Sequence, residues 1–143
     1  VYGTVPAPQK KRSMPYRRIT PRDMWVDDPA SPLYNQHFVL KHDPVTPWEF
    51  KQQMKLNDYA HSLKLFIRHN AADGRRKPVP GAGSSIFFHI WRRDGGAPTA
   101  GCTAMSEENL RAMIAWLDPS RHPLYILLPA REYLRLRRAW GLP

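Results

Sequence analysis

The residue types that could carry out nucleophilic chemistry lie together in one short stretch of the chain. His89 lies inside an apolar run from Ser85 to Trp91, a Gly-rich polar loop follows, and Cys102 comes at the end of that loop. Nucleophilic cysteine catalysis needs a thiolate, a base that generates it and amide groups that stabilise an oxyanion. A strand histidine and a loop cysteine that are joined by a short return can meet in space.

Two neighbours of Cys102 favour this chemistry. Gly101 would let the backbone approach a substrate and turn its N–H inward. A helix predicted to begin at Ser106 would favour a thiolate through its positive N-terminal end. The residue types alone leave a second interpretation open, in which His89 is a hydrogen-bonded core histidine and Cys102 is a small buried filler.

Three apolar segments are predicted to be strands. Residues 85–91 form a continuous apolar run, which is typical of a central strand buried on both faces. Residues 62–69 alternate between apolar and basic side chains, with Lys64 on the polar face; Phe66 on the same face indicates that this face is partly covered. Residues 124–128 predict another buried strand.

Two helices are predicted from their capping signals. Thr46, a proline at the first helical position and Glu49 form a capping box for a helix that reaches about Met54. Ser106 caps a clearer helix over residues 106–117, in which the apolar side chains form one stripe. Residues 131–143 have apolar side chains at helical spacing among arginines, which predicts a basic amphipathic tail whose apolar side is packed.

Residues 1–47 contain more than half of the 15 prolines, so they are predicted to be extended chain and loops rather than helix. Within them, residues 25–35 (WVDDPASPLYN) indicate an ordered loop with Trp25 and Tyr34 as anchors. The adjacent aspartates of this loop point to opposite sides of an extended backbone, so they are predicted to form turns rather than an acid/base pair.

Composition narrows the function classes. The formal net charge of +10 attracts polyanions, but no zinc-finger spacing and no RNA-binding aromatic pattern accompanies it, so we expect no nucleic-acid partner. One cysteine rules out an intramolecular disulfide and a multi-cysteine metal site. No apolar run is long enough to span a bilayer and no signal peptide is visible. The remaining histidines lack metal-ligand spacing: His37, His42, His61, His69 and His122.

The stretch SSIFFHIWRRDGGAPTAGCTAM, followed by SEENLRAMIAWLDP and PLYILLP, resembles the C-terminal half of the L,D-transpeptidase catalytic domain, also called the YkuD-type domain. That family has a strand histidine, a variable loop, a Ser/Thr-x-Gly-Cys motif, a helix and a final strand. His89, Thr99, Gly101 and Cys102 match it position for position. The loop at 25–35 resembles the same loop in a divergent, mostly proteobacterial branch of the family.

The resemblance implies a β-rich α+β domain over residues 1–130, with a twisted, partly closed sheet and a few short helices; the family's first strands would lie before Val1. It implies an enzyme in which Cys102 forms a thioester with a peptidoglycan stem peptide and passes it to a diaminopimelate amine, with His89 as base and without metal or cofactor. Such an enzyme would act in the periplasm or cell envelope. Hydrolysis of the same thioester, and a non-catalytic basic module that binds wall or nucleic acid, are the alternatives.

Two positions depart from the better-known branch of the family, which has His before the Gly and Arg or Asn two residues after the Cys. Ala100 and Ala104 stand there in this chain. The divergent branch includes enzymes that link L-Ala of one stem to diaminopimelate of another (a 1,3 crosslink), and the resemblance favours that product over the diaminopimelate–diaminopimelate (3,3) crosslink. The residues expected to line the peptide cleft are Tyr34, Asn35, Trp91 and Arg92.

Overall fold

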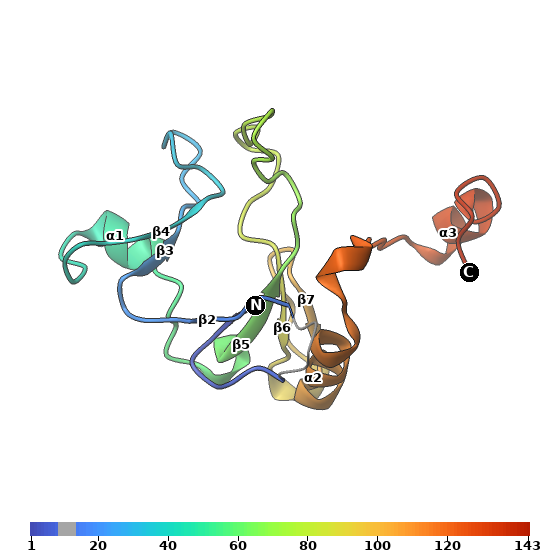
Figure 1. Ribbon diagram of the computed structural model, residues 1–143, viewed down its shortest axis with the longest axis horizontal. Coiled ribbons are helices and arrows are strands. Elements are labelled where there is room, and N and C mark those ends of the chain that lie inside the picture. Colours follow the sequence, from blue (N-terminus) through green and yellow to red (C-terminus); the bar gives the residue numbers. More distant parts are fainter. Residues whose placement is uncertain (9–13) are drawn as a thin grey trace.

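The computed structural model describes residues 1–8 and 14–143 (Figure 1). Its centre is a five-stranded mixed sheet in the order β2-β1-β5-β6-β7. The pairs β1–β5 and β5–β6 are antiparallel, whereas β1–β2 and β6–β7 are parallel. The strands are β1 (Tyr2–Gly3), β2 (Arg17–Arg18), β5 (Leu63–Phe66), β6 (Phe87–Ile90) and β7 (Thr103–Met105).

One face of this sheet is covered by α2 (Glu107–Trp116), which lies beside β6 and β7 in Figure 1. Leu110 and Ile114 of α2 are buried in the main hydrophobic cluster. Phe88 and Ile90 of β6 belong to the same cluster, together with the apolar residues of β5. The face of the sheet toward α2 is therefore the main core.

The opposite face is covered by a smaller lobe. A two-stranded antiparallel sheet, β3 (Asp23–Trp25) and β4 (His37–Val39), forms this lobe together with α1 (Pro47–Gln52). A second buried cluster joins Trp25 and Met54 of the lobe to Phe87 of β6, and Cys102 packs against it. The cysteine thus lies between the sheet and the lobe, away from α2.

The predicted helix starts are confirmed. Thr46 accepts a hydrogen bond from the backbone N–H of Glu49, and the Glu49 carboxylate accepts from the N–H of Thr46, which completes the capping box of α1. Ser106 accepts from the N–H of Asn109 at the start of α2. The loop anchors Trp25 and Tyr34 are also buried as predicted.

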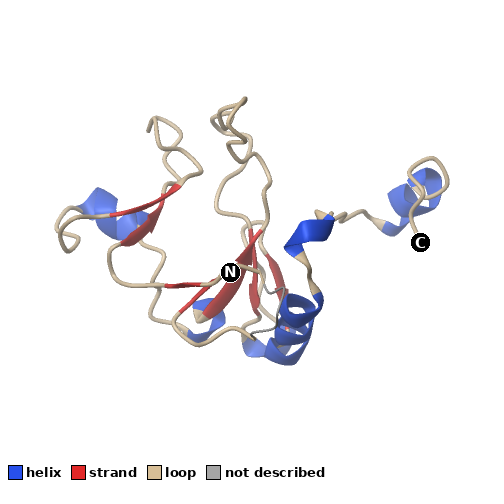
Figure 2. Cartoon of the chain, in the orientation of Figure 1, coloured by secondary structure: helices blue, strands red, loops and turns tan. Residues whose placement is uncertain are grey.

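The predicted central strands are confirmed with shorter bounds. All four residues of β6 are buried, as a strand covered on both faces requires. In β5, Leu63, Lys64 and Leu65 are all buried, so the polar face of this strand is covered more fully than its pattern indicated. A long loop, visible at the top of Figure 2, connects β5 to β6.

One strand was not predicted, and one predicted strand is absent. The structure has β7 at residues 103–105, where no strand was predicted from the sequence. Residues 124–128 are not a buried strand, because they form no regular structure and their apolar side chains are exposed, Leu124 by 89%. Tyr125 of this segment contacts the sheet, with its ring centre 4.6 Å from that of Phe88.

The tail contains a short helix, α3 (Ala130–Leu136), at the end of an extended segment that leads away from the sheet (Figure 1). None of its residues is buried, so the predicted packing of its apolar side is absent. The fold class is α+β, with one mixed sheet, one small sheet and a few short helices, as predicted. Across the described residues, every helix is too short or too polar to cross a bilayer.

The burial of Leu110 and the exposure of Leu124 predict different effects of their truncation on the free energy of unfolding. Leu110→Ala should lower the free energy of unfolding by about 3 kcal/mol, because Leu110 is fully buried beneath α2 and truncation leaves a cavity. Leu124→Ala is the matched control and should change it by less than about 0.5 kcal/mol. Urea denaturation measures both, and equal losses would contradict the exposed position of residues 124–128.

Candidate active site

His89 faces away from α2 because side chains alternate along β6. Phe88 and Ile90 pack in the main core, whereas Phe87 belongs to the cluster on the other face. His89 follows the same alternation and shares the face of Phe87. It is 3% exposed.

Cys102 comes to the same face through the parallel pairing of β6 and β7. Thr103 pairs with Phe88, so Cys102, one residue earlier, lies beside Phe87. Cys102 is partly buried and packs against the cluster that contains Phe87. Its thiol donates a weak hydrogen bond to the backbone carbonyl of Ser85, with an Sγ–O distance of 3.5 Å. The sulfur and the His89 ring therefore lie diagonally on one face, two residues apart along the strands.

The backbone before Cys102 is shaped by Thr99 and Gly101. The Thr99 hydroxyl donates to the carbonyl of Cys102 at 2.6 Å and accepts from the N–H of Gly101 at 3.3 Å. Gly101 has a φ of +136°, and a Cβ there would lie 3.2 Å from Cδ1 of Ile86. The positive φ strongly favours glycine, and a Cβ would also press on the end of the Ile86 side chain. The N–H of Gly101 is held by Thr99 in this structure.

The His89 ring is arranged as a base. Its Nδ1 lies 2.7 Å from the backbone carbonyl of Ile90, which can only accept, so Nδ1 carries the proton and Nε2 has a free lone pair. Burial lowers the pKa of His89, and the nearby Arg92 and Lys64 lower it further. The imidazole is therefore neutral at neutral pH and can accept a proton through Nε2.

The described contacts include no hydrogen bond between the thiol and His89, because Sγ is turned to Ser85. A rotation about the Cα–Cβ bond of Cys102 would redirect the sulfur within the same face, and hydrogen bonds of unliganded sites are commonly looser than those of the complex. The predicted support from the α2 N-terminus is wrong. β7 and Ser106 separate Cys102 from α2 by four residues of extended chain, and the helix field fades within the first turn.

A second histidine lies against the first. The rings of His61 and His89 are stacked, with centroids 4.6 Å apart. Nδ1 of His61 donates to Asp58 at 2.7 Å, and Arg92 forms an ion pair with the same carboxylate. Burial raises the pKa of Asp58, but hydrogen bonds from Arg92 and His61 outweigh it and hold the pKa at about 2. From the sequence, His61 was predicted to have no role in the site. Its contact with His89 arises only when the chain folds, so no local pattern could reveal it.

Lys64 is the other residue that the sequence did not single out. It pairs with His89 across β5 and β6, so its side chain shares the face of His89 and Phe87. The ammonium donates to the backbone carbonyl of Met54 at 2.7 Å and lies 5.4 Å from the centre of the Phe87 ring. Two features of the sequence indicated that Lys64 could be buried. It is a basic residue between apolar neighbours, and Phe66 lies on the same face of the strand.

The residues expected to line the cleft divide into two pairs. Tyr34 and Asn35 are buried, and the Asn35 amide bonds to the indole N–H of Trp25, the N–H of Ser85 and the carbonyls of His69 and Asn70. This geometry favours an anchoring role, in which Asn35 holds the segment that begins β6.

The second pair is at the surface. Trp91 is partly exposed and its ring packs over Gly95, whereas Arg92 is held against Asp58. Both follow β6 directly and remain available to a ligand. Asp28 accepts from the N–H of Ala30, so this aspartate forms a turn as predicted.

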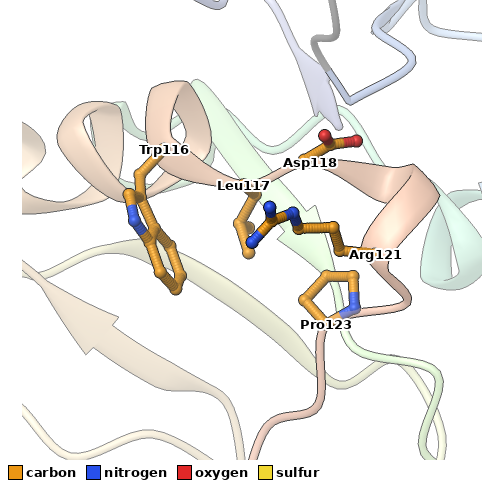
Figure 3. Close-up of a pocket in the computed structure, with 5 residues that line it drawn as sticks. All are labelled: Trp116, Leu117, Asp118, Arg121 and Pro123. Atoms are coloured by element: carbon orange, nitrogen blue, oxygen red, sulfur yellow. The ribbon is translucent and has the colours of Figure 1, made fainter.

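One pocket lies elsewhere on the molecule. It has a volume of about 340 Å³ and is formed at the end of α2 by Trp116, Leu117, Asp118, Arg121 and Pro123 (Figure 3). None of these side chains is a nucleophile for acyl transfer, so the face that carries Cys102 is the better candidate. Within residues 1–8 and 14–143, no three His, Cys, Asp or Glu side chains converge as metal ligands would.

The ion pair of Asp58 predicts a pH dependence of stability. Its folded-state pKa of about 2 lies below the ordinary value of 3.8, so its ionised form stabilises the fold above pH 4, and this contribution is lost as the pH falls toward 2. In Asp58→Asn the pH-dependent part of this contribution should be missing. Urea unfolding of both proteins between pH 2 and 6 measures the difference, and parallel curves across this range would contradict it.

Comparison with known proteins gives one family match. The family model described as the L,D-transpeptidase catalytic domain, YkuD, matches residues 3–126. No curated protein and no solved structure matches the chain. The matched range includes the whole five-stranded sheet from Gly3 onward and α2, and it ends before α3.

Proposed function

Because this chain belongs to the L,D-transpeptidase catalytic domain family, we propose that it acts on peptidoglycan as a cysteine acyltransferase with Cys102 as nucleophile and His89 as base. The family supports the coarser statement, an L,D-transpeptidase-type function in peptidoglycan. Peptidoglycan lies outside the cytoplasmic membrane, so the place of action would be the periplasm or cell envelope.

One observation carries the assignment of residues. Cys102 and His89 share the face of two paired strands, and the hydrogen bond to Ile90 leaves Nε2 of His89 able to accept the thiol proton. The alternative interpretation, a core histidine beside a filler cysteine, does not account for the polar groups on this apolar face. Lys64 and His61 join His89 there, and each of these groups is costly to bury.

The first half-reaction forms the acyl-enzyme. His89 takes the proton of the Cys102 thiol, and the thiolate attacks a carbonyl carbon of the donor stem. The tetrahedral intermediate collapses as the amide C–N bond breaks, and His89 returns the proton to the leaving amine. The product is a thioester on Cys102, and the distal part of the stem leaves as an amine.

The second half-reaction transfers the acyl group. The side-chain amine of a diaminopimelate on a second stem attacks the thioester carbonyl and gives its proton to His89. The C–S bond breaks, the new amide is the crosslink, and the proton returns to the sulfur. If water attacks instead, the product is a carboxylate and the enzyme is a hydrolase.

The donor carbonyl proposed here is that of L-Ala, which gives a 1,3 crosslink. Ala104 pairs with His89 across β6 and β7, so the position that holds Arg or Asn in the better-known branch lies beside the base. An Arg there could bind a stem carboxylate with two hydrogen bonds, and Ala offers none. The surface residues Trp91 and Arg92 are the remaining candidates for orienting the donor.

Cys102→Ala should abolish crosslinking and leave the fold intact, because it removes the nucleophile from a site where a small side chain fits. Sacculi or disaccharide peptides are incubated with each protein, and the muropeptides are analysed by mass spectrometry. Circular dichroism provides the control for folding. Crosslinking by the folded variant at the rate of the unchanged protein would refute the assignment.

His89→Ala should slow alkylation of Cys102 by iodoacetamide near neutral pH about tenfold or more, because the thiol loses the base that deprotonates it. Intact-mass spectrometry follows the single modification, since the chain has one cysteine. The matched control is His42→Ala, which removes an exposed histidine. Equal rates for all three proteins would show that His89 does not activate the thiol.

The 1,3 linkage predicts a specific fragment pattern. Dimers produced by the enzyme should be joined through L-Ala and diaminopimelate, because position 104 holds Ala in place of a side chain that could bind the carboxylate of a diaminopimelate donor. Tandem mass spectrometry of the dimers reads this bond directly. Dimers joined only through two diaminopimelates would contradict the donor assignment and leave the roles of Cys102 and His89 standing, and free carboxylates alone would indicate the hydrolase.

A further inference from the structure

Lys64 is buried at a position where an ammonium group has a high desolvation cost. It is 3% exposed, lies in the middle of β5 and packs against the Phe87 ring. Its hydrogen bond to the carbonyl of Met54 uses one of three donors. Among the residues that the structure describes, its ammonium forms no ion pair. A buried ammonium without a carboxylate partner calls for another source of negative charge.

The sheet register places Cys102 on the same face. Lys64 pairs with His89 on one side of β6, and the start of β7 brings Cys102 beside Phe87 on the other side. The ammonium lies near the Phe87 ring, and Cys102 packs against the cluster that contains this ring. Lys64 and Cys102 are thus on opposite sides of one strand, facing the same interior.

We propose that Lys64 is the counter-ion of the Cys102 thiolate, stabilising the charged sulfur from beneath the site without touching the substrate. This inference rests on the proposed function, because it takes Cys102 as the nucleophile. Lys64 is a positioning residue in this role. It places a positive charge on the face that carries the sulfur, which positions 100 and 104 do not supply here, since Ala100 and Ala104 are neutral.

The charges around Lys64 agree with this role. Burial lowers the pKa of Lys64 to about 8, and the charges of Asp58 and Cys102 act in the opposite direction. Lys64 and Cys102 are therefore close enough for their charges to interact. Asp58 is already neutralised by Arg92. The thiolate is the negative charge on this face that has no cation of its own among the described residues, which supports the proposed pairing with Lys64.

The other groups on this face do not supply the same charge. Burial lowers the pKa values of His61 and His89, so both rings are neutral at neutral pH. Arg92 is paired with Asp58 at the surface. When His89 takes the thiol proton, the sulfur shares its face with a transient imidazolium and with the Lys64 ammonium, and the ammonium persists after the proton has moved to the leaving amine.

The test is the pH dependence of Cys102 alkylation by iodoacetamide, in which the thiolate displaces iodide and forms a thioether. Lys64→Met keeps the volume and removes the charge. Lys64→Gln also removes the charge but can still donate to the Met54 carbonyl. The matched control is Lys55→Met at an exposed position next to Met54. Thermal unfolding is measured for all four proteins.

Both neutral variants should shift the midpoint of the alkylation profile upward by about one pH unit and slow alkylation at pH 7 about tenfold, as expected for the loss of one nearby opposite charge. Lys64→Met should melt at the same temperature or higher, because an apolar side chain of similar volume replaces a buried ion. Lys55→Met should match the unchanged protein in both measurements.

The proposal is overturned if the folded Gln variant keeps the profile of the unchanged protein, because the hydrogen bond to Met54 would then be the whole role of Lys64. It is also overturned if Lys55→Met produces the same shift. Alkylation reads the thiolate directly, so these outcomes are independent of turnover. Absence of crosslinking by the unchanged protein would instead count against the proposed function.

Discussion

The parallel pairing of β6 and β7 is the interaction on which the site depends. Phe88 pairs with Thr103, and this register alone puts Cys102 beside Phe87 and on the face of His89. Parallel neighbours cannot be joined by a tight turn, so the chain must return along the whole of β6 before β7 begins. Residues 91–102 make that return, and the Thr99–Gly101 turn ends it at the cysteine. A shift of one residue in this pairing would point Cys102 into the core beneath α2.

The two faces of the sheet differ in composition and in role. The face toward α2 is apolar and supplies most of the core, with Leu110 and Ile114 fully buried against β5 and β6. The other face carries His89, Lys64 and the thiol, and the lobe of β3, β4 and α1 covers it. Burial on this side has chemical consequences, since it lowers the pKa values of His89 and Lys64. Burial beneath the lobe thus produces both the neutral imidazole of His89 and the desolvated ammonium of Lys64.

Local signals in the sequence predicted the parts of the fold that depend on neighbouring residues. The Thr46 and Ser106 caps, the apolar run of β6 and the anchors of the 25–35 loop each depend on contacts within a few residues or on plain burial. β7 was not predicted because three residues are too few to show the alternation of apolar and polar side chains that indicates a strand. Residues 124–128 have the composition of a buried strand, but no backbone partner lies beside them in the described chain. His61 and Lys64 depend on the register between β5 and β6, which no local pattern encodes.

The account as a whole depends on a covalent bond between Cys102 and the donor stem. Intact-mass spectrometry of the protein mixed with a donor stem peptide, without an acceptor amine, tests this bond most directly. The account predicts an added mass equal to the acyl part of the donor, located on the peptide that contains Cys102 and released by hydroxylamine, as a thioester requires. Crosslinking activity without such an adduct, or an adduct on another residue, would contradict it.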